Sequence, residues 1–209
     1  MSVCTILIYG KSGSGKSRSL KNFKSDEITF INCNYKDLPI QNQFKYRLDS
    51  DNSAEVSAAV EGAPTDIIVI DDAGYLQTST FFAGHSRPKS GGSTFDLYNQ
   101  IGDECWSLIM TCKRKLPRQK RVYIIMHEIS NDYGDVKVRT IGKLMDEKAC
   151  IEGMFTICLR CMTDGKRHYF KTQASSNDVA KSPEGMFESN EIDNDLKLVD
   201  ERVKAFYGL

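Results

Sequence analysis

The sequence lacks any long apolar run, and this absence bears on membrane association. No stretch approaches the roughly 18 consecutive apolar residues that a membrane-spanning helix needs. The first residues also lack the basic start and the small-residue cleavage site of a secretory signal peptide. We therefore expect a cytoplasmic protein that has no membrane as a partner.

A disulfide framework is missing as well. The chain has seven cysteines, an odd number without a regular spacing, which indicates reduced thiols. Cys158 and Cys161 form a C-x-x-C pair, but no second pair follows at a spacing typical of zinc sites. Side chains three positions apart on a strand also point to opposite faces. We therefore expect neither a secreted disulfide scaffold nor a metal site at these cysteines.

The sequence has no net charge, because 28 Lys and Arg residues balance 28 Asp and Glu residues. This balance argues against a surface covered in basic residues for nucleic acid, but it leaves room for a local basic groove. Hydrophobic residues make up 40%, which is ordinary for a globular protein. Because no repeat or linker divides the chain, we predict a single domain over residues 1–209. It would comprise a core (3–173), a polar loop (174–189) and a C-terminal helix (192–207).

Four apolar segments rich in β-branched residues predict strands buried on both faces of a parallel sheet. They cover residues 3–9, 28–33, 66–71 and 121–127. Apolar residues at helical spacing lie between them at 54–61 and 94–116, and Pro117 is expected to end the second helix. This alternation of strands and helices predicts the α/β class.

The last third of the chain has a different pattern. Residues 154–162 and 168–173 predict two strands, and Asp164-Gly165 between them is typical of a tight hairpin turn. We therefore expect a C-terminal antiparallel hairpin attached to a mostly parallel central sheet.

Two long loops are expected at residues 77–93 and 130–143. Both follow predicted core strands at their carboxyl ends, the edge at which open α/β sheets bind ligands. Loops longer than about 12 residues inside a compact domain are usually functional or disordered.

Residues 10–17 read GKSGSGKS and match the phosphate-binding pattern G-x-x-x-x-G-K-[ST] in full. Glycines allow backbone N–H groups to surround a phosphate, and we expect a helix to follow the loop. Lys16 is expected to reach the β- and γ-phosphates, and Ser17 to bind Mg²⁺. The predicted nucleotide-binding residues are Gly10, Lys11, Ser12, Gly13, Ser14, Gly15, Lys16, Ser17 and Arg18.

Two acids follow the apolar strand segment IIVI at residues 67–70. Asp71 has the Walker B position, which predicts a metal-binding carboxylate that acts together with Ser17. Asp72 follows where many P-loop ATPases carry a glutamate that polarises the attacking water. Aspartate is one methylene shorter, so a catalytic role for Asp72 and a simple strand-capping role both stay open.

A third strand also ends in polar groups, in the segment VYIIMHE at residues 122–128. In the additional-strand class of P-loop ATPases, a polar residue at such a strand end senses the γ-phosphate. His127 is the first candidate for this role and Glu128 the second, and the alternative for His127 is a hydrogen-bonded structural residue. With Lys16 and Asp72, they complete the predicted catalytic set.

In combination, these motifs resemble those of phage-encoded RecA-like P-loop ATPases, small AAA-type nucleotide-binding proteins that accompany phage recombination and single-strand annealing. The resemblance covers roughly residues 3–198 and includes the segments IIVIDDAGYL, MHE, YFKTQ and AKSPEGMF. It implies a RecA-like core that binds and hydrolyses ATP with Mg²⁺. It also implies single-stranded DNA, a homo-oligomer, and phage recombination or replication proteins as partners.

The sequence departs from this family at one place. RecA-like proteins usually carry a catalytic glutamate after the second core strand. Here residues 32–35 at the end of that strand read NCNY, and the first acid after the strand is Asp37. Either Asp72 or Glu128 has taken the water-activating role, or hydrolysis is slow.

Two alternative functions stay open. One is a small-molecule or nucleotide kinase, whose two Walker strands would be adjacent. The other is a nucleotide-gated DNA-binding module with little turnover.

Binding of single-stranded DNA requires cations interleaved with groups that stack on bases. The two long loops supply both, and the candidate residues are Phe82, Arg87, Lys89, Lys137 and Arg139. The basic run at residues 113–121 is better explained as a solvated helix end. Three arginines are candidates for acting on the nucleotide of a neighbouring subunit: Arg139, Arg160 and Arg167.

Overall fold

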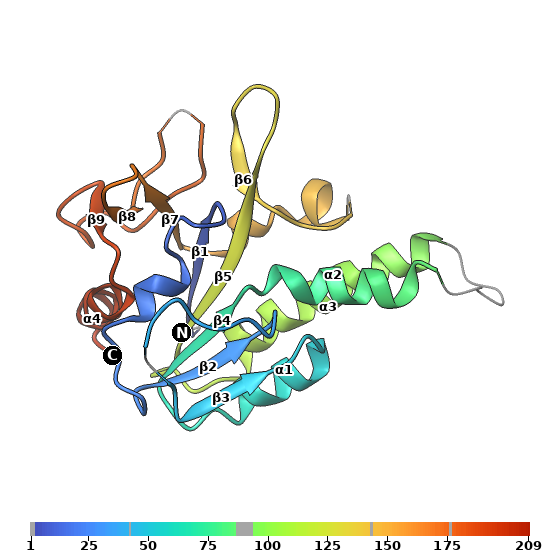
Figure 1. The fold of residues 1–209 in the computed structure, drawn as a ribbon, viewed down its shortest axis with the longest axis horizontal. Coiled ribbons are helices and arrows are strands. Elements are labelled where there is room, and N and C mark those ends of the chain that lie inside the picture. Colours follow the sequence, from blue (N-terminus) through green and yellow to red (C-terminus); the bar gives the residue numbers. More distant parts are fainter. Residues whose placement is uncertain (1–2, 42, 87–93, 143, 176) are drawn as a thin grey trace.

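A computed structural model describes residues 3–209 apart from residues 42, 87–93, 143 and 176. Its centre is a nine-stranded sheet in the order β3-β2-β4-β5-β1-β7-β8-β9, with β6 paired to β5 outside this path (Figure 1). The strands are β1 (Cys4–Gly10), β2 (Ile28–Asn32), β3 (Tyr46–Asp49), β4 (Ile67–Asp71), β5 (Arg121–Ser130), β6 (Val136–Val138), β7 (Ile157–Thr163), β8 (His168–Lys171) and β9 (Glu191–Asp193). The helices are α1 (Ser53–Glu61), α2 (Gly74–Gly84), α3 (Thr94–Arg114) and α4 (Leu196–Tyr207), with shorter turns η1 (Ser17–Leu20), η2 (Leu144–Ala149) and η3 (Ile151–Met154).

The sheet is parallel from β3 through β7 and becomes antiparallel only at β8 and β9 and in the β5–β6 pair. The predicted α/β class and its C-terminal antiparallel hairpin are therefore confirmed. Strand β5 lies between β1, which leads into the phosphate-binding loop, and β4, which ends at Asp71. A kinase with adjacent Walker strands predicts a different order, so the topology contradicts that alternative.

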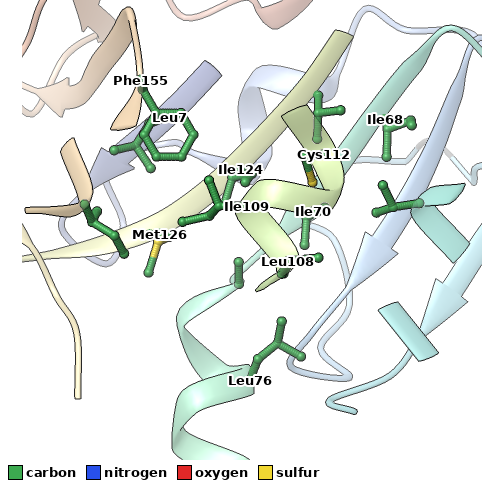
Figure 2. Close-up of a cluster of buried hydrophobic side chains, with 14 of the residues drawn as sticks. Leu7, Ile68, Ile70, Leu76, Leu108, Ile109, Cys112, Ile124, Met126 and Phe155 are labelled. Atoms are coloured by element: carbon green, nitrogen blue, oxygen red, sulfur yellow. The ribbon is translucent and has the colours of Figure 1, made fainter. Parts of the chain in front are cut away.

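Two hydrophobic clusters lie on opposite faces of the sheet, because successive side chains of a strand alternate between faces. Leu7, Ile70 and Ile124 belong to the cluster covered by α1, α2 and α3, and Figure 2 shows them in this cluster together with Leu108, Ile109 and Cys112 of α3. Ile6, Val69 and Tyr123 face the other cluster, which is covered by α4 and η1. The result is a sheet between two helical layers, which explains why the strand sequences are continuously apolar.

The first long loop was predicted wrongly in part, because residues 77–84 belong to helix α2. Leu76 and Gln77 are buried on this helix, and Gln77 donates a hydrogen bond to Cys105 of α3. Helix α2 thus forms through contacts with α3, which local sequence patterns do not reveal. In the second long loop, β5 extends to Ser130 and pairs with β6 as a hairpin.

The helix expected after the phosphate-binding loop is only the four-residue 3₁₀ turn η1. Such a turn has too few aligned peptides to build a substantial helix dipole. Leu20 and Phe23 then bury their side chains in the cluster beneath α4. The predicted phosphate-binding loop is therefore followed by a short turn and not by a long helix.

The C-terminal helix begins at Leu196 and not at residue 192, which lies in β9. Asp195 is the physical reason, because its side chain accepts hydrogen bonds from the N–H groups of Lys197 and Leu198. This arrangement is an N-cap, and it fixes the first turn of the helix. The helix ends at Gly208 with φ 63°, as glycine at a left-handed C-cap permits.

The basic run at residues 113–121 contributes to the fold more than a solvated helix end would. Lys120 donates hydrogen bonds to the carbonyl oxygens of Ala63 and Thr65, and Lys115 pairs with Glu61.

Among the helices of the described residues, none is long and apolar enough to cross a membrane.

One buried ion pair joins α4 to the centre of the sheet. Asp200 accepts two hydrogen bonds from the guanidinium group of Arg121, at 2.7 and 2.9 Å, and a third at 2.7 Å from the hydroxyl of Tyr123. All three side chains are buried. Burial comes first among the causes that raise the pKa of Tyr123, and the neighbouring Asp200 adds to it.

We predict that Tyr123→Phe lowers the free energy of unfolding by about 1.5–3 kcal/mol, because it removes one hydrogen bond to a buried carboxylate. Urea unfolding followed by circular dichroism measures the change. Tyr133→Phe is the matched control, since Tyr133 is 88% exposed and its loss of a hydroxyl leaves no buried carboxylate uncompensated. Equal stabilities of Tyr123→Phe and the unmodified protein would contradict the assigned role of this hydroxyl.

Candidate functional site

The site lies where the carboxyl ends of four adjacent parallel strands meet. Strands β2, β4, β5 and β1 are neighbours in the sheet, and each is followed by polar residues. The phosphate-binding loop follows β1, Asp71 ends β4, and His127 lies in β5 opposite Gly10 of β1. The topology therefore brings together residues more than 100 positions apart in the sequence.

Lys16 is buried inside the phosphate-binding loop. Its Nζ donates hydrogen bonds to the carbonyl oxygens of Gly10 at 3.0 Å and Lys11 at 2.9 Å. The Nδ1 atom of His127 is 3.4 Å from the same Nζ. Burial lowers the pKa of Lys16, although the charges of Asp72 and Asp71 oppose this shift. The ammonium group is thus held at the mouth of the loop, where a phosphate would replace the carbonyl oxygens as its partner.

The loop has a backbone shape that only glycine allows at one critical position. Gly15 has φ +101°, and a Cβ atom there would lie 2.7 Å from Nδ1 of His168. His168 and Cys161, from the C-terminal hairpin, both contact the carbonyl oxygen of Ser14, at 2.8 and 3.1 Å. The β7–β8 hairpin therefore packs against the phosphate-binding loop at Ser14, and the local sequence motif does not predict this contact.

Ser17 and Asp71 meet as the predicted metal ligands. The Ser17 hydroxyl donates to Oδ2 of Asp71 at 2.7 Å, whereas Oδ1 of Asp71 is buried and has no hydrogen-bond partner among the described residues. Both groups are hard oxygen ligands of the kind that Mg²⁺ prefers. The described residues contain no group of three or more His, Cys, Asp and Glu side chains that could hold a metal. In nucleotide sites, Mg²⁺ typically binds one or two protein oxygens together with phosphates and water.

Asp71 is held in an unfavourable setting for a carboxylate. Burial, followed by repulsion from Asp72, raises the pKa of Asp71 to about 6, although the Ser17 hydrogen bond acts in the opposite direction. A divalent cation beside Oδ1 would remove this cost. The setting of Asp71 therefore fits a site that is completed by a cation.

Asp72 lies next to Asp71, between the ammonium group of Lys36 and the imidazole ring of His127. Its Oδ2 forms an ion pair with Lys36 and lies 3.5 Å from Nδ2 of Asn34, and its Oδ1 is 3.3 Å from Nε2 of His127. Burial alone would raise the pKa of Asp72, but the contacts with His127 and Lys36 outweigh burial and hold the pKa well below its usual range. Asp72 also has φ 56°, a left-handed conformation that Asp tolerates better than most residues. Its carboxylate is ionised and directed toward the phosphate loop.

His127 and Glu128 separate because adjacent side chains of a strand face opposite sides. His127 is directed toward the phosphate loop and bridges Lys16 and Asp72. Glu128 instead forms a two-point ion pair with Arg160, at 2.8 and 2.9 Å, with only 3% of its side chain exposed. The structure thus corrects the expectation for Glu128, which stabilises the β5–β7 region and does not reach the phosphate loop.

The three arginines predicted to act on the nucleotide of a neighbouring subunit have different partners and exposure in the structure. Arg160 is paired with Glu128 and Asp178 of its own chain, and Arg167 with Asp164 and Glu191. Arg139 is exposed, and its backbone N–H donates to the carbonyl oxygen of His127. Of the three, Arg139 is the one that both borders the site and faces solvent.

The predicted DNA-binding residues that the structure describes lie on two separate parts of the fold. Phe82 lies near the end of α2 with 64% of its surface exposed, and Lys137 and Arg139 lie on the exposed side of the β5–β6 hairpin. Arg87 and Lys89 lie outside the described residues. Figure 1 shows that the α2–α3 pair and the β5–β6 hairpin project from the sheet in different directions.

Lys36 was not among the predicted site residues. Its position in the sequence could have indicated it, because Lys36 follows the second core strand and the carboxyl ends of parallel strands share one edge of the sheet. Arg18, by contrast, was predicted to bind nucleotide, and its guanidinium group donates to Asn194 at 3.3 Å. Arg18 therefore joins the phosphate loop to the start of α4.

Comparison with known families agrees with this geometry. A family model described as AAA domain matches residues 3–183. The chain belongs to the AAA domain family. The match covers the phosphate loop, both acids at the end of β4, His127 and the β7–β8 hairpin. No curated protein matches the chain.

Membership of the AAA domain family establishes a nucleotide-binding protein of the P-loop ATPase type. The inserted strand β5 and the Ser17–Asp71 hydrogen bond have the arrangement that this type of site requires. Besides Oδ1 of Asp71, the hydroxyl of Ser14 in the loop and Oδ1 of Asp72 are buried at this site without a hydrogen-bond partner among the described residues. Such atoms are costly unless a ligand or water satisfies them.

We predict that Asp71→Asn stabilises the nucleotide-free protein in EDTA at pH 7.5 by roughly 1–3 kcal/mol, because it removes a buried charge. The folded-state pKa of Asp71, about 6, is above its ordinary value near 4, so ionisation lowers stability as pH rises from about 4 to about 6. The gain should therefore be smaller at pH 5 than at pH 7.5.

Urea unfolding at the two pH values measures this gain. Asp26→Asn serves as the matched control, because Asp26 is exposed and its substitution should change stability little at either pH. A less stable Asp71→Asn protein at pH 7.5 in EDTA would contradict the prediction.

Proposed function

We propose that this protein hydrolyses ATP with Mg²⁺. The observation that carries the proposal is the cluster at the end of β1, β4 and β5. In it, Lys16, the Ser17–Asp71 pair and the charged Asp72 face one phosphate loop. Phosphoryl transfer relies mainly on positioning and on electrostatic stabilisation, and these residues supply both.

Each residue has a distinct task in this proposal. The loop N–H groups and Lys16 bind the β- and γ-phosphates, and Ser17 with Asp71 holds the cation. Bound Mg²⁺ would offset the negative charge of the phosphate oxygens. Asp72, held ionised by His127 and Lys36, accepts a hydrogen bond from the attacking water and orients it. His127 links this carboxylate to Lys16 and so responds to the γ-phosphate.

We also propose that the ATPase acts on single-stranded DNA. Support comes from exposed aromatic rings at the ends of two projections: Phe82 and Phe95 where α2 and α3 face their connection, and Tyr133 in the β5–β6 turn. Exposed rings can stack on bases, and the exposed cations Lys137 and Arg139 belong to the same hairpin as Tyr133. The resemblance to phage-encoded RecA-like ATPases suggests recombination or replication intermediates as the DNA and a homo-oligomer as the active form.

The test is ATP hydrolysis measured with and without single-stranded oligo(dT), with the molecular mass determined in both states. The proposal expects Mg²⁺-dependent turnover that DNA increases. It also expects DNA binding that is weak, because the chain has no net charge, and that weakens with salt, because contacts of Lys and Arg with phosphates release counterions. Tyr133→Ala should reduce DNA stimulation without changing turnover in the absence of DNA. ATP binding without turnover would instead support a nucleotide-gated module. Turnover and mass that are both indifferent to DNA would refute the DNA part.

A further inference from the structure

Lys36 connects the site to a strand that none of the motifs includes. It follows β2, the parallel sheet neighbour of β4, so its backbone lies at the same edge of the sheet as Asp71 and Asp72. The Lys36 ammonium group forms an ion pair with Oδ2 of Asp72. This oxygen belongs to the carboxylate that the proposed function assigns to the attacking water.

The loop that carries Lys36 is held firmly at its base. The buried Asn32 donates from Nδ2 to the carbonyl oxygen of Lys36 at 3.0 Å and to Asp49 of β3 at 2.6 Å. Tyr35 is fixed in a left-handed conformation with φ 52°, and its hydroxyl donates to Asp51 at 3.3 Å. Hydrogen bonds therefore hold the backbone at Lys36, and the long, flexible lysine side chain extends from it.

The two partners of this ion pair differ in exposure. The Asp72 side chain is fully buried, whereas 40% of the Lys36 side chain is exposed. The lysine thus extends from the solvent-facing side of the site to a buried carboxylate. An incoming phosphate carries more negative charge than one carboxylate, and lysine is a flexible point charge suited to phosphate.

From these contacts we infer that Lys36 exchanges partners when ATP binds: it leaves Asp72 and binds the γ-phosphate. Without ATP, Lys36 is paired with Oδ2 of Asp72, and Oδ1 is buried beside His127 at 3.3 Å, so neither oxygen is open to an attacking water. With ATP, the γ-phosphate attracts Lys36, and Oδ2 of Asp72 becomes free for the water. Lys36 is then both a ligand that distinguishes ATP from ADP and a positioning residue for hydrolysis. This inference rests on the proposed function.

The first experiment compares binding of a non-hydrolysable ATP analogue and of ADP, both with Mg²⁺, by isothermal titration calorimetry. Lys36→Met should weaken the triphosphate analogue about tenfold or more, the size of one charge-assisted hydrogen bond, and ADP less than about twofold. Lys36→Arg should restore most of the difference. Lys45→Met is the matched control, because Lys45 is an exposed cation at the other end of the same connection, 5.1 Å from the Tyr46 ring, and should behave like the unmodified protein.

The second experiment tests the exchange itself with a double-mutant cycle. Asp72→Asn should strengthen binding of the triphosphate analogue, because it frees Lys36 in advance. The gain should be clearly smaller when Lys36 is already Met. Equal gains in the two backgrounds would overturn the exchange of partners.

The remaining outcomes separate this inference from the proposed function. Equal weakening of both nucleotides by Lys36→Met, or no weakening of either, would overturn the inference while turnover by the unmodified protein still stands. An increase in turnover by Lys36→Met would also overturn it, because Lys36 would then only block Asp72. An unmodified protein that neither binds nor hydrolyses ATP would refute the proposed function itself.

Discussion

Lys16→Ala should lower kcat/KM for ATP by about 10³-fold, the upper end of the effect of removing one electrostatic contact to a transition state. Nucleotide binding should weaken as well, since two carbonyl oxygens hold the Lys16 ammonium group inside the loop. Alanine cannot replace a charge that the geometry holds between the loop, His127 and the two acids. Steady-state phosphate release and calorimetric titration with ATP measure the two effects.

The loop itself supplies the control for this prediction. Lys11→Ala removes the same kind of side chain from the same loop, but Lys11 is exposed and contributes its carbonyl oxygen to Lys16. We expect Lys11→Ala to retain turnover within a few-fold of the unmodified protein. Similar losses for Lys11→Ala and Lys16→Ala would mean that loop charge in general, and not the placement of Lys16, supports binding.

Asp72→Asn should lower kcat by about 10²- to 10³-fold, within the range that a correctly placed general base or water-orienting group contributes. Asparagine is the chosen replacement because it tolerates the left-handed backbone at φ 56° and keeps the size of the side chain. Binding of ATP should persist, since Lys16 and Ser17 are unchanged. The expected signature is therefore a loss in kcat with ATP affinity retained or increased.

Asp37→Asn tests the alternative acid on the same edge of the sheet. Asp37 is exposed and lies one residue after Lys36, so it is the first acid after the second core strand. We expect kcat of Asp37→Asn within about twofold of the unmodified protein, as for most exposed substitutions. A large loss for Asp37→Asn together with normal turnover of Asp72→Asn would reverse the assignment.

The core strands could be predicted because their sequences carry the signal locally. The segments ILIY, IIVI and VYIIM are continuously apolar, and a strand buried on both faces requires such a run. The elements that were missed are those whose existence depends on partners. Strand β3 is four residues long and pairs with β2, and helix α2 is stabilised by contacts with α3.

For the adjacent residues His127 and Glu128, the sequence could not establish which side chain faces the phosphate-binding loop. Both are polar, both end the same apolar strand, and the sequence favoured His127 without excluding Glu128. The alternation of side chains on β5 separated them, since one faces Lys16 and the other faces Arg160 of β7. Only the neighbouring strands decide which side of the sheet holds the phosphate loop.

By itself, the sequence determined the phosphate loop, the pair Asp71-Asp72 and the α/β class, because each depends on residues that are close together along the chain. The lack of net charge, of long apolar runs and of a cysteine framework argued against a surface covered in basic residues, a membrane-spanning helix and a disulfide scaffold, respectively. The tertiary structure decided the contact of Lys36 with Asp72 and the support of Ser14 by His168. These contacts join residues from different strands, and strand order in a parallel sheet is set by packing of the whole sheet between its helical layers and not by any local pattern.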